Sequence, residues 1–232
     1  MFEASRVRAI TIDLDDTLWP IWPTIARAEV ALHAWLAVQA PQTAAMFATP
    51  QALRELRQAM TLERPELLHD LGAMRRESIR LGLTRAGDDP ALAEAGYEIF
   101  MDARQRVELY EDALPALEFL ARRYPIVAIS NGNSDLARIG LTHFFKHALS
   151  AHQFGIAKPD PRIFHAGAQA AGVAPREVLH VGDDPLLDVV GALDAGMQAY
   201  WLSREAAPWE HAGRGEPHVV ANGLHRLAEI LA

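Results

Sequence analysis

Hydrophobic and polar residues are arranged along this chain in two different patterns. A β-branched run from Val7 to Ile12 stops abruptly at Asp13, as a buried parallel strand does where it delivers polar residues to its carboxyl edge. From about Trp22 to Arg106, Ala, Leu, Glu and Arg recur at helical spacing. The first run therefore predicts a strand, and the second block predicts a set of helices.

After Leu109 the pattern predicts strands that alternate with helices. The expected strands are 126–130, 147–150, 178–181 and 197–202, and the expected helices are 112–123, 134–145, 160–171, 186–195 and 222–231. Such alternation is typical of βαβ units with helices on both faces of a sheet. The sequence thus predicts an α/β core with a Rossmann-like, doubly wound parallel sheet over 1–18 and 111–232. An all-helical domain over 19–110 is inserted after the first strand, and 206–217 is expected to be a surface loop.

Composition and charge restrict the class of protein. Of 232 residues, 50% are hydrophobic and 22% are charged, which is enough apolar material for a folded core. The net charge of −8 indicates an acidic surface, so nucleic acid is not an expected partner. The absence of cysteine excludes disulfides, thiolate catalysis and Cys-based metal centres. The short apolar run at the N-terminus fits neither a signal peptide nor a membrane span, so we expect a cytoplasmic protein that does not bind membranes.

Polar residues follow the predicted strands in four segments. The segments are DLDDTLW after the first strand, SNGN after the second, KPDP in a loop and VGDDPLLD after a later strand, and they contribute Asp13, Asp15, Ser130, Asn131, Lys158, Asp183, Asp184 and Asp188. In open parallel sheets, ligands bind beyond the carboxyl ends of the strands. We therefore expect these side chains to meet at one edge of the sheet.

The chemistry of this set points to a metal ion and a phosphate. Several ionised carboxylates in one cleft repel one another unless a cation neutralises them. Hard oxygen ligands without His or Cys favour Mg²⁺ over zinc. The Lys158 ammonium and the Ser130 hydroxyl then suit an anionic substrate with several acceptor oxygens, for which phosphate is the best match.

In this order and combination, the four segments resemble the motifs of the haloacid dehalogenase superfamily, the Mg²⁺-dependent aspartyl phosphatases, from about Ala9 to Trp201. The helical block resembles the type-1 helical cap of that family. The resemblance implies that Asp13 is the nucleophile that attacks phosphorus. It implies that Asp15 protonates the leaving alcohol and then activates the water that hydrolyses the aspartyl phosphate. It also implies that Asp13, Asp15 and Asp183 hold Mg²⁺.

The remaining motif residues match supporting positions of the family. The resemblance implies that Ser130, Asn131 and Lys158 bind the phosphate and that Lys158 also offsets the charge of the nucleophile. Asp184 matches a second acidic position near the metal. Asp188 matches a position that orients Lys158 or the metal's waters, although a place on a helix surface is its structural alternative.

The resemblance implies a phosphatase that acts on a small phosphorylated metabolite. Dehalogenating members lack a carboxylate at the position of Asp15, because no leaving alcohol needs a proton, so Asp15 favours phosphoryl transfer. The strand-end segments look most similar to phosphatases of flavin mononucleotide, its phosphorylated pyrimidine precursor and related sugar phosphates. A phosphomutase of the same fold is the alternative enzyme. A phospho-acceptor signalling domain or a catalytically silent binding protein is the alternative from another class.

Four further side chains are candidate substrate contacts. Trp19 and Trp22 closely follow the nucleophile motif, and they either stack on an aromatic substrate or fill the seam between core and insertion. Arg75 and Arg76 are expected mid-helix in the insertion. A solvated surface is the favoured interpretation for both, and contact with a substrate anion, assigned to Arg76, is the alternative.

Overall fold

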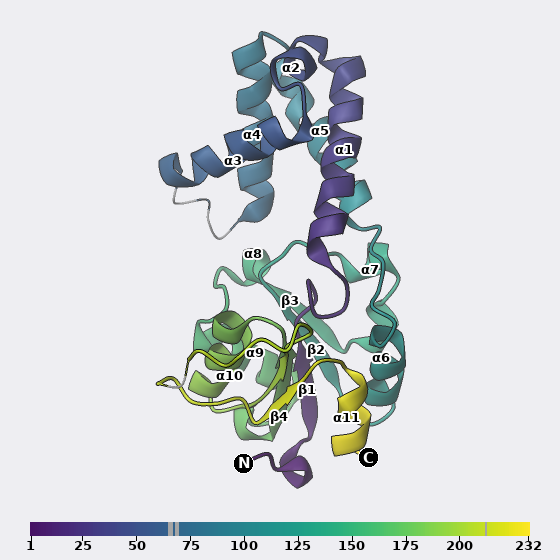
Figure 1. Ribbon diagram of the computed structural model, residues 1–232, viewed down its shortest axis with the longest axis vertical. Coiled ribbons are helices and arrows are strands. Elements are labelled where there is room, and N and C mark those ends of the chain that lie inside the picture. The colour runs from purple at the N-terminus through teal and green to yellow at the C-terminus, as the bar shows by residue number, and fades with distance from the viewer. Residues whose placement is uncertain (65–66, 68–69, 212) are drawn as a thin grey trace. The chain divides into compact units, whose positions relative to one another are not determined.

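The computed structural model describes residues 1–64, 67, 70–211 and 213–232, and the chain forms two compact units (Figure 1). The first unit combines Met1–Pro20 with Glu108–Ala232, and the second is the intervening segment Ile21–Val107. The first unit holds all the strands found in the described residues, whereas the second is helical. The chain therefore leaves the sheet-containing unit after one strand and returns to complete it.

A six-stranded parallel sheet forms the centre of the first unit. Its strands are ordered β3-β2-β1-β4-β5-β6. The bounds are β1 Ala9–Ile12, β2 Ile126–Ser130, β3 His147–Ser150, β4 Val178–Gly182, β5 Gln198–Leu202 and β6 Val219–Ala221. Ile12 of β1 is in register with Ala128 of β2 and with Val181 of β4. This arrangement confirms the predicted α/β fold and places the carboxyl ends of β1, β2 and β4 side by side.

Helices cover both faces of this sheet (Figure 1). Their bounds are α6 Ala113–Ala121, α7 Leu136–Ile139, α8 Ala151–Phe154, α9 Pro161–Ala171, α10 Gly191–Asp194 and α11 His225–Ile230. In Figure 1, α9 and α10 lie on one face and α6 and α11 on the other. The longest of them, α9, begins where Asp160 caps the backbone N–H of Arg162, and it ends at Gly172 in the left-handed conformation that glycine adopts without strain.

Burial on both sides of the sheet explains why its strands are continuous apolar runs. All residues of β1, β2, β4 and β5 are buried. One face packs against α9 and α10 through a core whose buried members include Val127, Ile129, Ile163, Phe164, Val178, Val189 and Trp201. This double-sided packing fixes the strands and hence the residues that follow them.

The structure differs from the sequence-based prediction in the shorter elements. The helix expected over 134–145 is the four-residue α7, which ends at Gly140 with φ of 88°, followed by a short 3-10 turn. The helix expected over 186–195 begins as a π-helix, Pro185–Val190, and continues as α10. Helix α8, a single turn of four residues, and strand β6, of three residues, were not predicted.

Among its described residues, the second unit contains five α-helices and a short 3-10 helix, Pro90–Leu92. The α-helices are α1 Ile21–Gln39, α2 Pro41–Met46, α3 Pro50–Glu63, α4 Leu71–Ala86 and α5 Ala93–Arg104. Their shared core is apolar and includes Leu32, Leu36, Ile79, Leu83 and Phe100. Local signals begin two of the helices: Thr49 caps α3 at Pro50, and Asp70 accepts the backbone N–H of Ala73 in α4.

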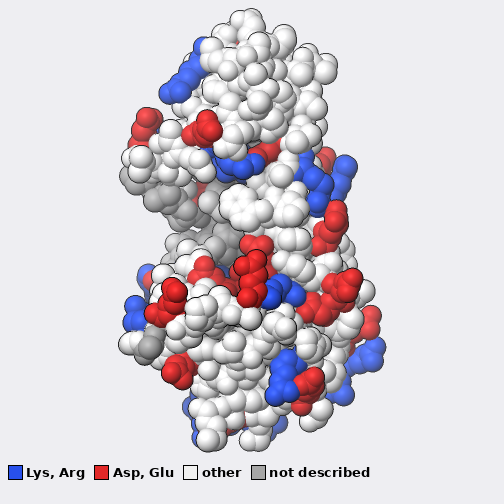
Figure 2. Space-filling model, viewed as in Figure 1, with Lys and Arg blue, Asp and Glu red and all other residues white. Residues whose placement is uncertain are grey.

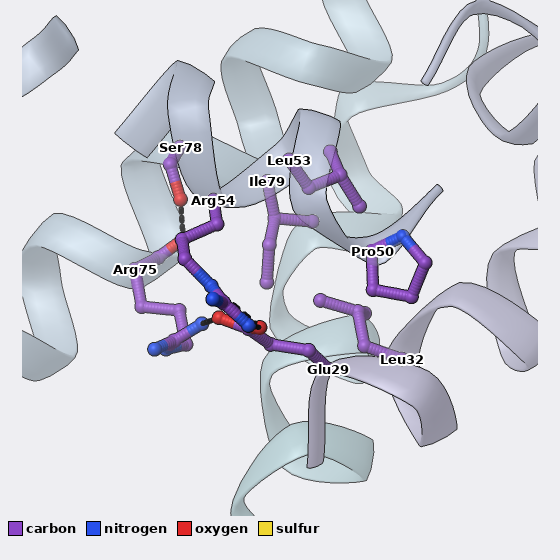
Figure 3. Close-up of a pocket in the computed structure, with 8 residues that line it drawn as sticks. All are labelled: Glu29, Leu32, Pro50, Leu53, Arg54, Arg75, Ser78 and Ile79. Carbon is purple, nitrogen blue, oxygen red and sulfur yellow. Dashed lines mark hydrogen bonds and ion pairs between the residues drawn. The ribbon is translucent and has the colours of Figure 1, made fainter. Parts of the chain in front are cut away.

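A buried ionic cluster lies within this helical unit (Figure 3). Glu29 of α1 is 3% exposed, and its Oε2 accepts hydrogen bonds from Arg54 of α3, including one of 2.9 Å from Nε. Arg75 of α4 places Nη1 3.9 Å from Glu29 Oε1 and its guanidinium 3.5 Å from the ring centre of Phe100. The adjoining cavity of about 10 Å³ is at the lower limit for one water molecule. The cluster therefore joins three helices and leaves no room for a substrate.

Neither the surface charge, on the face that Figure 2 shows, nor the hydropathy of the helices sets one part of the described chain apart. On this face, acidic and basic side chains are interspersed. No helix in the described ranges combines the length and hydropathy that a membrane span requires.

Candidate active site

Three strand ends place the candidate residues at one edge of the sheet. Asp13 directly follows β1, and its backbone N–H still bonds to the carbonyl of Val181 in β4, at 2.9 Å. Ser130 is the last residue of β2, and Asp183 directly follows β4. Because neighbouring parallel strands end together, residues more than 50 positions apart in the sequence lie at the same place.

Lys158 is the charged centre of the site. Its Nζ lies 2.7 Å from Asp13 Oδ1 and 2.6 Å from Asp188 Oδ1, and the whole residue is only 4% exposed. Burial alone would lower the pKa of this ammonium, but the two carboxylates outweigh burial and raise it above its usual value. Lys158 is therefore a fixed positive charge between two aspartates.

Three carboxylates gather around this lysine. Oxygen atoms of Asp13, Asp183 and Asp188 all lie within 4.8 Å of one another, the one such group of potential metal ligands in the described part of the chain. Burial and the neighbouring carboxylates raise the pKa of Asp13 well above its usual range, against the opposing effect of Lys158. Burial, followed by Asp188, raises the pKa of Asp183 to about 7. One ammonium thus leaves negative charge uncompensated, and a donor set of hard oxygens fits Mg²⁺.

Asp188 is buried and does not lie on a helix surface, so that structural alternative is wrong. It is 0% exposed within the π-helix. Its Oδ1 accepts from Lys158 and from His180 Nε2 at 3.1 Å, and its Oδ2 accepts the backbone N–H of Asp184 at 3.0 Å. Burial would raise the pKa of Asp188, but Lys158 and His180 hold it well below its usual value. Asp188 is therefore an ionised carboxylate that orients Lys158.

The side chain of Asn131 holds the loop that carries Lys158. Its Oδ1 accepts the backbone N–H of Lys158 at 2.8 Å, and its Nδ2 donates to the carbonyl of the same residue at 3.0 Å. The amide therefore positions Lys158, and a phosphate contact through its second Nδ2–H stays a prediction. The neighbouring Ser130 Oγ accepts the backbone N–H of Gly132 at 3.0 Å, which leaves its hydroxyl proton to donate.

Asp15 is not among the three carboxylates that are grouped in the described part of the chain, and Mg²⁺ binding by Asp15 stays a prediction. Its Oδ1 accepts from the indole Nε1 of Trp19 at 2.8 Å and from the hydroxyl of Ser134 at 3.3 Å. Trp19 is 0% exposed, so its ring has no free face on which a substrate could stack, and the substrate-contact interpretation is replaced by one in which it positions Asp15. The nearby Thr17 hydroxyl donates to Asp183 Oδ1 at 3.0 Å.

Asp184 has a local structural role. Its Oδ1 accepts the backbone N–H groups of Leu186 and Leu187 at 2.8 and 2.7 Å, which caps the π-helix that carries Asp188. The carboxylate of Asp184 is not part of the group of potential metal ligands found in the described residues. The two adjacent aspartates thus differ in function, because Asp183 faces the cluster whereas Asp184 begins the following helix.

The remaining candidates belong to the helical unit. Trp22 is 63% exposed. Arg76 places its guanidinium 3.8 Å from the ring centre of Tyr97 and pairs with Glu94 at 3.1 Å. Arg75 is buried rather than solvated, because Glu29 and an aromatic ring surround it, and both arginines lie near the start of α4 and not in its middle. Substrate contact by Trp22 or Arg76 stays a prediction.

His180 is the residue of this site that sequence reasoning missed. It lies in the middle of β4, where it is 1% exposed and bonded through both ring nitrogens. The available signal was a single ionisable side chain inside the apolar run VLHVG, directly before the acidic motif. An ionisable group that is buried in a strand needs hydrogen-bonding partners, and the acidic residues that follow the strand are candidates for that role.

Fold and site together define a protein with a Rossmann-like parallel sheet, whose acidic centre with its buried lysine lies at the carboxyl edge of that sheet. A family profile described as haloacid dehalogenase-like hydrolase matches residues 7–196, and the chain belongs to this family of hydrolases. The membership confirms the resemblance found in the sequence and decides against a phospho-acceptor signalling domain.

Individual relatives show how far the similarity extends. The chain is 34% identical over 234 residues to 5-amino-6-(5-phospho-D-ribitylamino)uracil phosphatase YigB of Escherichia coli, covering 97% of each chain. It is 39% identical over 143 residues to a phosphoserine phosphatase of Thermus thermophilus, covering 59% of this chain and 57% of the relative. A solved structure of 2-haloacid dehalogenase from Pseudomonas syringae matches with a TM-score of 0.87 and 36% identity, covering 97% of this chain and 98% of that one.

Proposed function

We propose that this protein is a Mg²⁺-dependent phosphatase that hydrolyses a small phosphomonoester through an aspartyl phosphate on Asp13. The observation that carries the proposal is the buried Lys158 ammonium, held 2.7 Å from Asp13 beside two further carboxylates. A phosphate dianion repels a carboxylate nucleophile, so positive charge must be fixed at the point of attack. The similarity to two phosphatases supports the same reaction class.

The chain's own residues supply each step of the chemistry. A carboxylate oxygen of Asp13 attacks phosphorus, and the bond from phosphorus to the ester oxygen breaks. The departing oxygen takes a proton from Asp15, which then removes a proton from water. That water attacks phosphorus, the bond to the Asp13 oxygen breaks, and inorganic phosphate leaves with Asp13 restored.

Binding and charge compensation belong to the surrounding groups. Lys158 and the free hydroxyl proton of Ser130 contact the phosphoryl oxygens, and Asn131 keeps Lys158 in place. Asp13 and Asp183 would hold Mg²⁺, which supplies positive charge at the phosphoryl group when it is bound. We assign selection of the leaving group to the helical unit acting as a cap. Among phosphorylated metabolites, the name of the Escherichia coli relative supports 5-amino-6-(5-phospho-D-ribitylamino)uracil, a phosphorylated pyrimidine, as a candidate substrate. Flavin mononucleotide and sugar phosphates are the other candidates.

A phosphate-release assay tests this function. The substrates are 5-amino-6-(5-phospho-D-ribitylamino)uracil, flavin mononucleotide, phosphoserine, glyceraldehyde 3-phosphate and the chromogenic 4-nitrophenyl phosphate, each with Mg²⁺ or with a chelator. We expect phosphate release that needs Mg²⁺ and is lost in Asp13→Asn. Formation of a phosphate isomer without net phosphate release would indicate the phosphomutase. Equal activity of Asp13→Asn and the parent would rule out Asp13 as the nucleophile.

Dehalogenation of a 2-haloacid is the second candidate, because the matching structure from Pseudomonas syringae bears that name. In that reaction the departing halide needs no proton, so the carboxylate of Asp15 would have no role. We therefore measure halide release from 2-chloropropionate beside phosphate release. Phosphate release that falls sharply in Asp15→Asn supports the phosphatase, whereas halide release that is unchanged in this variant supports the dehalogenase.

A further inference from the structure

We propose that His180 is a positioning residue: a neutral imidazole with its proton on Nε2 that fixes Asp188 where Asp188 can hold Lys158 against Asp13. The inference rests on the proposed function, because the consequence of misplacing Lys158 is read as a loss of phosphatase activity. It concerns a strand residue that takes no part in the chemical steps above.

A continuous chain of hydrogen bonds connects His180 with the nucleophile. Thr11 Oγ1 lies 2.9 Å from His180 Nδ1, and His180 Nε2 lies 3.1 Å from Asp188 Oδ1. The same Asp188 oxygen is 2.6 Å from Lys158 Nζ, which is 2.7 Å from Asp13 Oδ1. The chain begins in the sheet, where Thr11 of β1 is directly in register with His180 of β4. Rigid strands therefore fix one end of it.

The partners of the ring decide where its proton is. Asp188 Oδ1 accepts from the Lys158 ammonium at 2.6 Å and Oδ2 accepts the backbone N–H of Asp184 at 3.0 Å, so both oxygens act as acceptors and His180 Nε2 is the donor of its contact with Oδ1. The imidazole is buried and shares Asp188 Oδ1 with the Lys158 ammonium, and both features favour a neutral ring with one N–H. Nδ1 then accepts the hydroxyl proton of Thr11, because a hydroxyl can donate or accept as its partner requires. Both ring nitrogens are satisfied in this tautomer only.

The orientation of Asp188 depends on three donors from three directions. Its Oδ1 accepts from Lys158 and His180, and its Oδ2 accepts from the backbone of Asp184. If the donor at 180 is lost, Oδ1 retains only the lysine, whose flexible side chain cannot itself define a position. The ring of Phe164 packs edge-on against the imidazole with centres 4.9 Å apart, so water has no access to replace the missing donor.

Three substitutions separate positioning from packing. His180→Gln places an amide N–H near the position of Nε2, so it keeps the bond to Asp188. His180→Asn places its amide near Nδ1, so it reaches Thr11 but not Asp188. His180→Phe keeps the ring volume and removes both bonds. We expect Gln to retain kcat within about threefold and Asn and Phe to lower kcat by about 10- to 100-fold, with KM changed little.

The readouts are phosphate release from 4-nitrophenyl phosphate with Mg²⁺, thermal unfolding of each variant, and the ¹⁵N chemical shifts of the imidazole in the parent. The shifts should show a protonated Nε2 and an unprotonated Nδ1. A Phe variant as active as the Gln variant would reduce His180 to a packing residue, and a proton on Nδ1 would overturn the inference even if no variant folds. If the parent releases no phosphate from any substrate, the proposed function fails, while the ring tautomer is still decided by NMR.

Discussion

Replacement of Gly182 by alanine should displace the side chain of Asp188. Gly182 is the last residue of β4, and a methyl group on its Cα would lie 2.2 Å from Asp188 Cγ, 2.4 Å from Oδ2 and 2.5 Å from Cβ. Side-chain carbons do not approach other atoms this closely. Because the Cβ of Asp188 is also too near, rotation of its carboxylate alone cannot relieve the contact, and the π-helix that carries it must shift.

The size of the effect follows from these distances. Ordinary contact begins at 3.4 Å, so Asp188 must retreat by about 1 Å, which carries it away from Lys158 at 2.6 Å and from His180 at 3.1 Å. A displacement of about 1 Å in a catalytic arrangement costs about 100-fold in rate, or about 2.7 kcal/mol in activation free energy. Insertion of one methyl group into a packed site also costs about 1–3 kcal/mol of folding free energy.

The assay compares Gly182→Ala with Gly213→Ala, a matched control at which, apart from the adjoining residues of the chain, no heavy atom of the described residues lies within 4 Å of the added methyl. Phosphate release with saturating Mg²⁺ gives kcat and KM, and urea denaturation gives the free energy of unfolding. We expect kcat of Gly182→Ala to fall by about two orders of magnitude while the control keeps the parent value. If the two variants have equal kcat and equal stability, the close approach of β4 to Asp188 is wrong.

Three further predictions concern stability. Thr11→Val leaves the Nδ1 atom of the buried imidazole without its donor, so urea denaturation should show a loss of about 1–3 kcal/mol, whereas no loss would mean that this hydrogen bond is not formed. Arg204→Met removes two hydrogen-bond donors that lie 3.0 and 3.2 Å from the carboxylate of Asp112. Burial would raise the pKa of Asp112, but the Arg204 hydrogen bonds lower it, so the loss of about 2 kcal/mol in the free energy of unfolding should be full above pH ~4 and fade as pH falls through the folded-state pKa. A loss independent of pH would contradict this reasoning. Glu29→Gln leaves the guanidinium groups of Arg54 and Arg75 without their charged partner and should destabilise the helical unit by about 3 kcal/mol. The control Glu94→Gln, at an exposed position, should cost less than about 1 kcal/mol. Equal costs would show that burial of the cluster has no energetic consequence.

Five of the six strands in the described residues could be predicted from the sequence alone. Strands β2 and β3 have the bounds that the pattern predicts, and β4 differs by one residue. A strand that is buried on both faces is predominantly apolar, so its end is visible where acidic residues begin. Asp13 and Asp183 were identified for this reason, since each directly follows such a run. Because neighbouring parallel strands share one carboxyl edge, the meeting of these residues also followed from the pattern.

Only the tertiary structure decided what each side chain does within that site. Asn131 holds the backbone of Lys158 from 27 residues away, and Thr11 bonds to His180 from 169 residues away. Hydrophobic periodicity reports whether a position is buried, but it carries no information on which partner fills the hydrogen bonds of a buried polar group. That choice depends on distances of a few tenths of an ångström between distant segments, which are set when the sheet and its helices pack together.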